Sequence, residues 1–214
     1  MNQAERASRA IRQGRVDLFK KCDFGHYNFK GIHAIFNNVA YYGNIEALEF
    51  MIKKFGSELV TYENSSCLQS AALNNQTKAF MFLVEQGADI LAEQKWGTEN
   101  PNYSSTTPLY WACTFKGYEI ADYLIANGAD VNHKSQENLR AAIDKQDFEM
   151  IRLLILAGIE IEDNYHYNVA NRASREYIEK NLEAILEEKK VLDFKKLLQT
   201  ELKAKAPAQQ RMKI

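Results

Sequence analysis

The sequence predicts an all-α solenoid in which helix–turn–helix units stack along one axis. Three observations support this fold class. A helix-starting segment, Thr107-Pro108-Leu109, has counterparts in the same register on both sides of it, and the central units close on a glycine. The 214 residues also contain only 3 prolines and 10 glycines, which leaves little material for a linker. Because stacked units share one interior, we expect one continuous body.

The clearest unit spans residues 107–132. Thr107 can cap a first helical turn through its hydroxyl, and Pro108 suits that turn because its missing N–H would be unpaired there. The small side chains of Ala112 and Cys113 let this helix lie close to its neighbours. A second apolar helix follows and ends at Gly128, which can adopt the left-handed conformation that terminates helices. The unit is therefore predicted to be helix, turn, helix and loop.

Other copies of this unit lie on both sides of it. Two keep the register without gaps, at residues 66–90 and 137–161. A looser copy spans residues 36–56, and weaker ones lie near residues 10–18 and 164–178. Terminal units are expected to diverge because one of their faces meets water instead of a neighbour. We expect an array of about six units over residues 1–188, with degenerate ends.

The opening segment Thr107–Cys113 and the closing segment Gly128–Asn132 together resemble an ankyrin repeat, whose pattern is TPLHxAA, a second helix ending in LL, and then GADVN. Tyr110 replaces the usual histidine, and Gly117 comes one place later than the usual glycine. Tetratricopeptide repeats also pair helices with a period of about 34, but lack these opening and closing signals. The resemblance implies an ankyrin-repeat solenoid.

An insertion separates two of the units. Their starts, near residues 66 and 107, are 41 positions apart, whereas the family period is about 33. The extra residues lie between Ala92 and Ser105, where an ankyrin repeat projects its β-turn finger. Trp96 and Tyr103 in this long finger are either held out for a partner or folded back on their own repeat. Trp111 is expected to pack inward or to support the finger.

The carboxy-terminal segment continues the apolar pattern. Its leucines, isoleucine and phenylalanine keep helical spacing in two stretches, with a break expected between Lys189 and Asp193. We expect residues 189–206 to form a capping helix and residues 207–214 to form a flexible basic tail. This tail is either a solvated terminus or a phosphate-binding or targeting segment.

The resemblance implies that partner-binding side chains follow the small pair of each first helix and occupy the finger. In the centre of the array these positions are aromatic or apolar, and charged residues flank them, as in interfaces with aromatic anchors inside a polar rim. Alternatively, a register shifted by one residue would place the central side chains in the core. The predicted partner-binding residues are Tyr41, Tyr42, Leu73, Asn74, Trp96, Tyr103, Thr114, Phe115, Asp144, Lys145 and Arg172, with Arg12, Gln13 and Asn171 at equivalent positions of the terminal units.

Composition restricts the classes of partner. The chain is 46% apolar and 26% charged, with 27 basic and 28 acidic residues. This balance lacks the broad basic surface of a dedicated nucleic-acid binder. The longest apolar stretch, residues 153–159, is far shorter than the ~20 residues that cross a bilayer. We therefore expect neither a nucleic-acid nor a membrane partner.

The amino terminus and the cysteines suggest a reducing compartment. The first residues lack the apolar core of a secretory signal, and Glu5 and Asp17 disfavour the alternative of a mitochondrial presequence. Cys22, Cys67 and Cys113 are odd in number and far apart, which fits reduced thiols. We expect a cytoplasmic protein, or one secreted into a host cytosol without a cleavable signal.

Catalytic patterns are missing from the sequence. The four histidines form no HExxH pair, the cysteines lack metal-ligand spacing, and GxSxG, GxxxxGK and GxGxxG are absent. We therefore expect no enzyme activity, metal or cofactor. The predicted function is that of an adaptor or scaffold, monomeric alone, which binds another protein through its concave face and finger. The alternative is an inhibitor or effector whose Trp96 finger occludes the active site of an enzyme.

Overall fold

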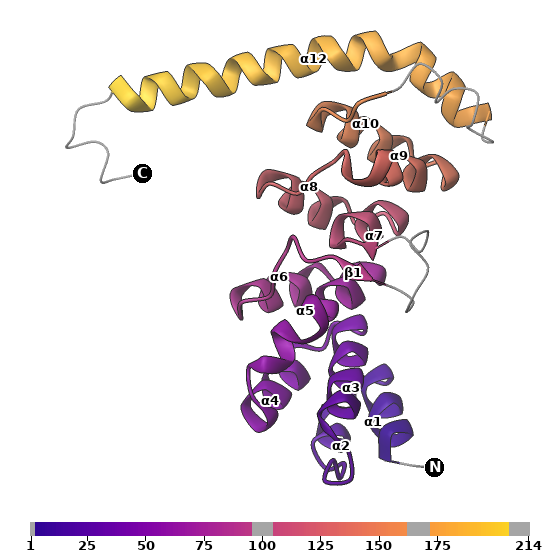
Figure 1. The fold of residues 1–214 in the computed structure, drawn as a ribbon, viewed down its shortest axis with the longest axis vertical. Helices are drawn as coiled ribbons and strands as arrows, with labels where there is room; N and C mark the ends of the chain where they lie inside the picture. Colours follow the sequence, from indigo (N-terminus) through magenta and orange to yellow (C-terminus); the bar gives the residue numbers. More distant parts are fainter. Residues whose placement is uncertain (1–2, 96–104, 162–171, 206–214) are drawn as a thin grey trace.

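The computed structural model describes residues 3–95, 105–161 and 172–205 as an elongated stack of helices. Figure 1 shows the first helices at one end of the long axis and the last helix lying across the other. The elements are α1 (Gln3–Arg12), α2 (Val16–Phe19), α3 (Phe29–Tyr41), α4 (Ile45–Phe55), α5 (Glu58–Leu73), α6 (Thr77–Glu85), β1 (Gln94–Lys95), β2 (Ser105–Thr106), α7 (Pro108–Thr114), α8 (Tyr118–Ala126), α9 (His133–Asp144), α10 (Phe148–Ala157) and α12 (Arg172–Lys205).

The helices form two columns. One column contains the first helix of each unit, and its members contact each other in the order α1, α3, α5, α7 and α9. The other contains the second helices, in the order α2, α4, α6, α8 and α10. A single apolar cluster runs through the stack from Ala7 to Ile185. The expected all-α solenoid with one shared interior is therefore present.

The unit formed by α7 and α8 is built as the sequence indicates. The hydroxyl of Thr107 accepts a hydrogen bond from the backbone N–H of Tyr110 at 3.2 Å, and Pro108 is the first residue of α7. Ala112 and Cys113 have no exposed surface. Gly128 follows α8 with a φ of +90°, a conformation that favours glycine. Local capping therefore fixes the boundaries of this unit.

Helix α5 is interrupted by a kink that no pattern in the sequence predicts. Tyr62 is extended, and Glu63, Asn64 and Ser65 have φ values of 45°, 52° and 54°. Three successive left-handed residues without a glycine are uncommon. Regular helix resumes after this kink, where the sequence places the start of the unit. Leu59 and Val60, before the kink, are also fully buried in the apolar cluster.

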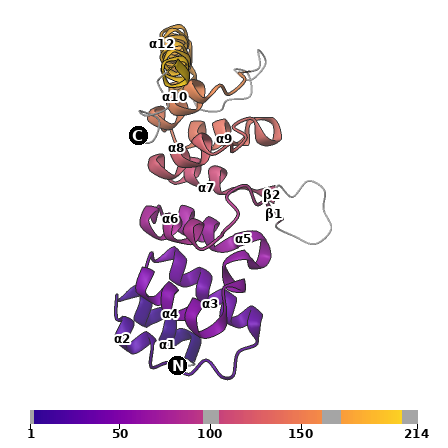
Figure 2. The same ribbon diagram turned by 90° about the vertical axis from the view of Figure 1, so that its left-hand side faces the viewer.

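The inserted segment leaves the stack as a two-stranded ribbon. Strands β1 and β2 are antiparallel, with Gln94 opposite Thr106 and Lys95 opposite Ser105. Figure 2 shows this ribbon projecting sideways from the middle of the stack. The predicted finger therefore has a β-hairpin stem at the expected place. Trp96 and Tyr103 lie outside the described residues.

Helix α12 is continuous, so the predicted break between Lys189 and Asp193 is wrong, and the predicted boundary after residue 188 falls inside one helix. Two ion pairs of helical spacing span this region: Lys189 Nζ lies 2.9 Å from the carboxylate of Asp193, and Lys190 Nζ lies 2.6 Å from that of Glu187. Such pairs support a helix, and a change of apolar face does not require the helix to stop. Among the described helices, none is long and apolar enough to cross a membrane.

Candidate protein-binding surface

The predicted partner-binding positions form a row along one side of the stack. They are the last residue of each first helix and the residue after it, and the contacts between successive first helices bring them side by side. The members that the structure places in this row are Tyr41 and Tyr42 after α3, Leu73 and Asn74 after α5, Thr114 and Phe115 after α7, and Asp144 and Lys145 after α9. We call these eight residues the end row.

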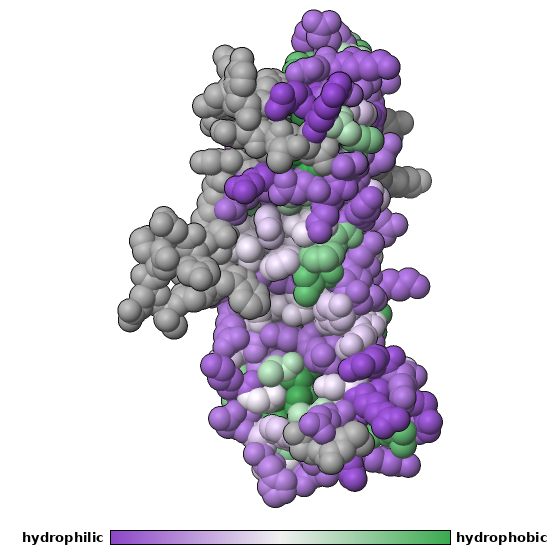
Figure 3. Space-filling model, turned by 90° about the vertical axis from the view of Figure 1, so that its right-hand side faces the viewer, coloured by the Kyte–Doolittle hydropathy of each residue, from purple (hydrophilic) through white to green (hydrophobic). Residues whose placement is uncertain are grey.

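The central side chains of the end row lie at the surface. Phe115 is 40% exposed, and Leu73 is half-buried. Neither is sealed between adjacent units, as the alternative register shifted by one residue would require. Figure 3 shows the side of the stack that carries the first helices, with a pale to green area near mid-height and a second green area nearer the lower end, separated by hydrophilic surface. The area near mid-height is one of two apolar areas on this side of the stack.

Two neighbours hold the ring of Phe115. The Trp111 ring stacks on it, with centroids 5.9 Å apart and planes 24° apart. Nζ of Lys145, from the next unit, lies 5.9 Å from the centroid of the Phe115 ring, within the range of a cation–π interaction. These contacts restrict the Phe115 side chain while leaving much of its surface open.

Trp111 is fixed in turn by Gln69 of the preceding unit. Nε1 of Trp111 donates a hydrogen bond to Oε1 of Gln69 at 3.2 Å. Nε2 of Gln69 donates to the backbone carbonyl of Thr106 at 3.0 Å, and Gln69 is only 4% exposed. One buried amide therefore links α5, α7 and strand β2. Within the described part of the chain, Trp111 packs against the core and is joined to the finger only through Gln69. In the sequence, Gln69 is a polar residue between Leu68 and Ser70, which gives no signal of this role.

The other strand of the finger is tied to the stack as well. Nδ2 of Asn64, in the kink of α5, donates a hydrogen bond to the backbone carbonyl of Glu93 at 2.9 Å. Glu93 directly precedes β1, and Thr106 ends β2. Both sides of the stem are therefore anchored to the same helix, α5.

The part of the end row nearer the amino terminus is more closely packed than the surroundings of Phe115. The rings of Tyr41 and Tyr42 meet edge to face with centroids 5.1 Å apart, and both residues are half-buried. Nδ2 of Asn74 donates to the backbone carbonyl of Tyr41 at 2.9 Å. Asn74 thus joins two units, a structural contact in addition to its predicted partner-binding role. Thr114 also bonds within its own helix, through its hydroxyl to the carbonyl of Tyr110.

Charged residues border the upper part of the row. Asp144 and Lys145 are exposed. Arg172 is the first residue of α12, and its Nε lies 2.7 Å from a carboxylate oxygen of Glu176, an ion pair that raises the pKa of the guanidinium. The other end of the array contributes Arg12, which ends α1, and the exposed Gln13. Asn171 lies outside the described residues.

The described residues were compared with the requirements of a nucleophilic cysteine and of a metal site. Cys67 and Cys113 are buried free thiols, and burial raises the pKa of Cys67 to about 12. A thiol that stays protonated at neutral pH is a poor nucleophile. Within residues 3–95, 105–161 and 172–205, no group of three or more histidine, cysteine, aspartate or glutamate residues is arranged to hold a metal ion.

A comparison with protein families agrees with this arrangement of units. A family model for ankyrin repeats (3 copies) matches residues 37–135 and residues 90–165. Together the two matches cover more than half of the 214 residues, including the three units that share an ungapped register and the insertion between two of them. The chain belongs to the ankyrin repeat family.

Proposed function

We propose that this protein is an adaptor or scaffold that binds a partner protein through the end row and the finger, and that it has no catalytic activity of its own. Ankyrin repeats generally mediate protein–protein interaction, so the class of activity follows from the family. The observation that carries the finer proposal is the exposed Phe115 ring, held between Trp111 and Lys145.

Preorganisation favours such a site as a binding anchor. An aromatic side chain that is already restricted loses less conformational freedom when a partner covers it. Aromatic anchors surrounded by polar residues are also where binding energy concentrates in protein interfaces. Phe115 has both properties, because Trp111 and Lys145 restrict its ring and Asp144 and Lys145 are exposed beside it.

The finger supports the same proposal. Its stem is anchored to α5 through Asn64 on one strand and through Gln69 on the other. Gln69 also positions Trp111, which stacks on Phe115. A partner that contacts both the finger and Phe115 therefore meets two features positioned by one helix. The free thiols are consistent with a reducing compartment, and we propose a cytoplasmic location.

Substituting Phe115 tests the proposal. Proteins captured by the wild type from cells of the source are identified, and their affinities are measured for Phe115→Ala and for Phe148→Ala. Phe148 is a matched control, because it is 37% exposed and stacks on Tyr177, but belongs to the second column of helices. We expect Phe115→Ala to weaken binding roughly 30-fold, about 2 kcal/mol, with little change in Tm, and the control to bind normally.

Two results would contradict this function. A loss of Tm in Phe115→Ala that matches the loss of affinity would make Phe115 a packing residue. A set of captured proteins that is unchanged by the triple variant Tyr41→Ala, Leu73→Ala and Phe115→Ala would place the binding surface elsewhere.

An inhibitor or effector is the second candidate. The observation that favours it is the anchoring of both strands of the finger, because a segment that occludes an active site must keep its position. Titrating the protein into a captured enzyme and measuring that enzyme's activity separates the candidates. A stoichiometric loss of activity indicates an inhibitor, and an unchanged activity indicates a scaffold.

A further inference from the structure

The kink of α5 holds the segment that leads into the finger. Nδ2 of Asn64 donates a hydrogen bond to the carbonyl of Glu93 at 2.9 Å, and Oγ of Ser65 accepts one from the backbone N–H of Asp89 at 2.9 Å. Asp89 and Glu93 lie between the end of α6 and the start of β1. We call residues 89–93 the finger entry. The kink therefore fixes the finger entry at both of its ends.

A second set of contacts joins the kink to His33 of α3, which is only 1% exposed. Nδ1 of His33 lies 3.6 Å from a carboxylate oxygen of Glu63, and Nε2 lies 3.2 Å from Oγ of Ser66. The Tyr62 ring packs edge to face on the imidazole, with centroids 4.7 Å apart. One buried side chain thus contacts the residues before and after the left-handed turn as well as the first residue within it.

These contacts fit a neutral imidazole. With its hydrogen on Nδ1, His33 directs that hydrogen towards Glu63, and its Nε2 accepts the hydroxyl hydrogen of Ser66. The oxygen of Ser66 can then accept the hydrogen bond that Nδ2 of Asn37 donates at 2.8 Å. A second proton, on Nε2, would take the acceptor away from the Ser66 hydroxyl and would place a charge in a buried position. Both changes cost free energy.

Two opposing effects set the charge of His33. Burial disfavours the imidazolium, and the partly exposed carboxylate of Glu63 favours it. Burial is the larger effect, so the pKa of His33 lies below its ordinary value. Among the described residues, the titratable groups that contact His33 are Glu63 and Tyr62, both of α5. The stabilisation of the kink by His33 is therefore complete above the pKa of an exposed histidine, about 6.5, and is lost as the pH falls through the lowered value.

The kink depends on contacts of this kind. Left-handed backbone costs free energy for residues other than glycine, and it persists only where neighbouring groups hold it. We propose that His33 is a positioning residue for the finger: while neutral it holds the kink, and through Asn64 and Ser65 the finger entry, and its protonation releases the finger entry. The consequence for partner binding rests on the proposed function, whereas the release is a property of the free protein.

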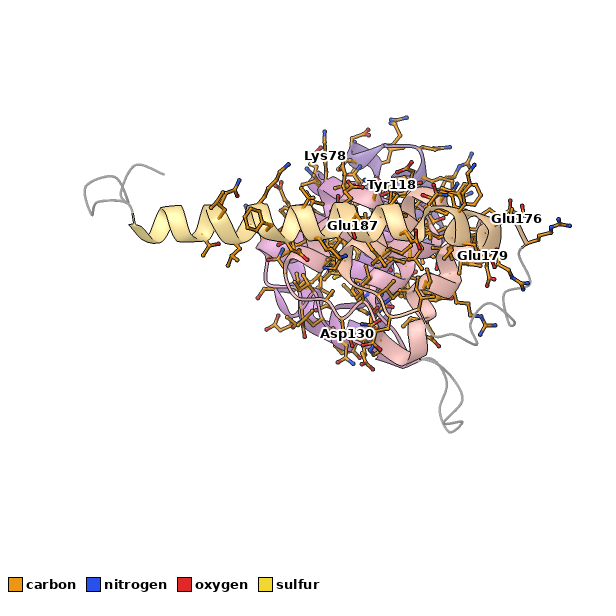
Figure 4. All side chains as sticks on the ribbon, turned by 90° about the horizontal axis from the view of Figure 1, so that it is seen from above. Lys78, Tyr118, Asp130, Glu176, Glu179 and Glu187 are labelled. Carbon is orange, nitrogen blue, oxygen red and sulfur yellow. The ribbon has the colours of Figure 1, made fainter. Side chains whose placement is uncertain are left out.

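A second histidine acts on the finger entry in the opposite direction. Nε2 of His133 lies 3.4 Å from a carboxylate oxygen of Glu93, so a protonated His133 would attract the finger entry. The two residues line a cavity of about 190 Å³ together with Asp130. Figure 4 shows Asp130 on the side of the stack opposite Tyr118. Because protonation of the two histidines has opposite effects, His33 is best tested in a chain that carries His133→Gln.

Hydrogen exchange at the Asp89 amide tests the proposal, because this N–H bonds to the kink. In the His133→Gln chain, the protection factor of this amide should fall several-fold between about pH 7.5 and about pH 5, a range that spans the titration of histidine. Adding His33→Gln should remove the fall, because the amide side chain stays neutral. His26→Gln is the matched control, because the side chain of His26 is 84% exposed, and it should leave the fall unchanged.

Three results would overturn the proposal: a protection factor of Asp89 that does not depend on pH in the His133→Gln chain, the same fall after His33→Gln, or loss of the fall after His26→Gln. If His33→Gln does not fold, NMR titration of the His133→Gln chain decides. An Asp89 amide that titrates together with the His33 imidazole supports the proposal, and one that does not contradicts it. Release of the finger entry at low pH with unchanged partner binding would support this proposal and contradict the role of the finger in the proposed function.

Discussion

Phe115 and Phe194 are both exposed phenylalanines, yet their surroundings differ. Phe115 stacks on Trp111 and lies near the ammonium group of Lys145, and Gln69 fixes Trp111. Phe194 is 64% exposed on a helix that the stack supports only in its first half. The comparison shows two ways of presenting an apolar surface. Side chains of neighbouring units hold Phe115 in place. Phe194 is positioned only by the rigidity of the helix that carries it.

The largest effect is expected from removing the anchor of α12. Ile178 and Ile185 are 1% and 4% exposed, and shortening either to alanine should cost about 2–5 kcal/mol of the docking free energy of α12. Hydrogen exchange should show α12 amides losing protection while the amides of α7 keep theirs. Leu186→Ala, at an exposed neighbouring position, is the control. Equal loss of protection throughout the stack would mean that α12 is not a separable element.

A smaller effect is expected from removing the side chain of Gln69, which fixes the Trp111 ring beside Phe115. Gln69→Ala removes the hydrogen bonds that Gln69 makes with the Trp111 N–H and with the carbonyl of Thr106, at a cost of about 1–3 kcal/mol in the free energy of unfolding. In a Trp96→Phe background, the fluorescence of Trp111 should shift to longer wavelength. Ser70→Ala, one position along, should leave the emission unchanged. An unaltered spectrum in Gln69→Ala would show that Trp111 is held by packing alone.

The smallest effect is expected from the ammonium group beside Phe115. Lys145→Gln removes a cation–π interaction that at exposed sites is worth about 0.5–1 kcal/mol. Urea denaturation of this variant and of Lys53→Gln, an exposed lysine of α4, measures the difference in the free energy of unfolding. A double-mutant cycle with Phe115→Leu should recover the same energy. A coupling energy of zero would mean that Lys145 does not hold the ring.

The repeating units were predictable because their signals are local. The hydroxyl of Thr107, the ring of Pro108 and the flexibility of Gly128 each act within one turn, so each can be recognised from neighbouring residues. The end row was predictable for a related reason, because its positions follow from the register of the units. The site of the finger followed from the spacing between two of them.

The remaining features depend on contacts between distant residues. Gln69 meets Trp111 and Thr106, 42 and 37 positions away, and no spacing rule reveals those hydrogen bonds. The left-handed kink at Glu63–Ser65 has no glycine to announce it. In α12 the apolar residues change face, and the sequence alone suggested a break where the ion pairs of Lys189 and Lys190 bridge a continuous helix.

The continuity of α12 has a consequence for valency. From residue 189 to residue 205 an unbroken helix extends about 25 Å, a fixed spacer where a flexible linker would allow a range of separations. A partner that contacts both the end row and the exposed half of α12 would have to match a fixed separation between the two surfaces. Such a partner would be retained by avidity, even if each single contact were brief.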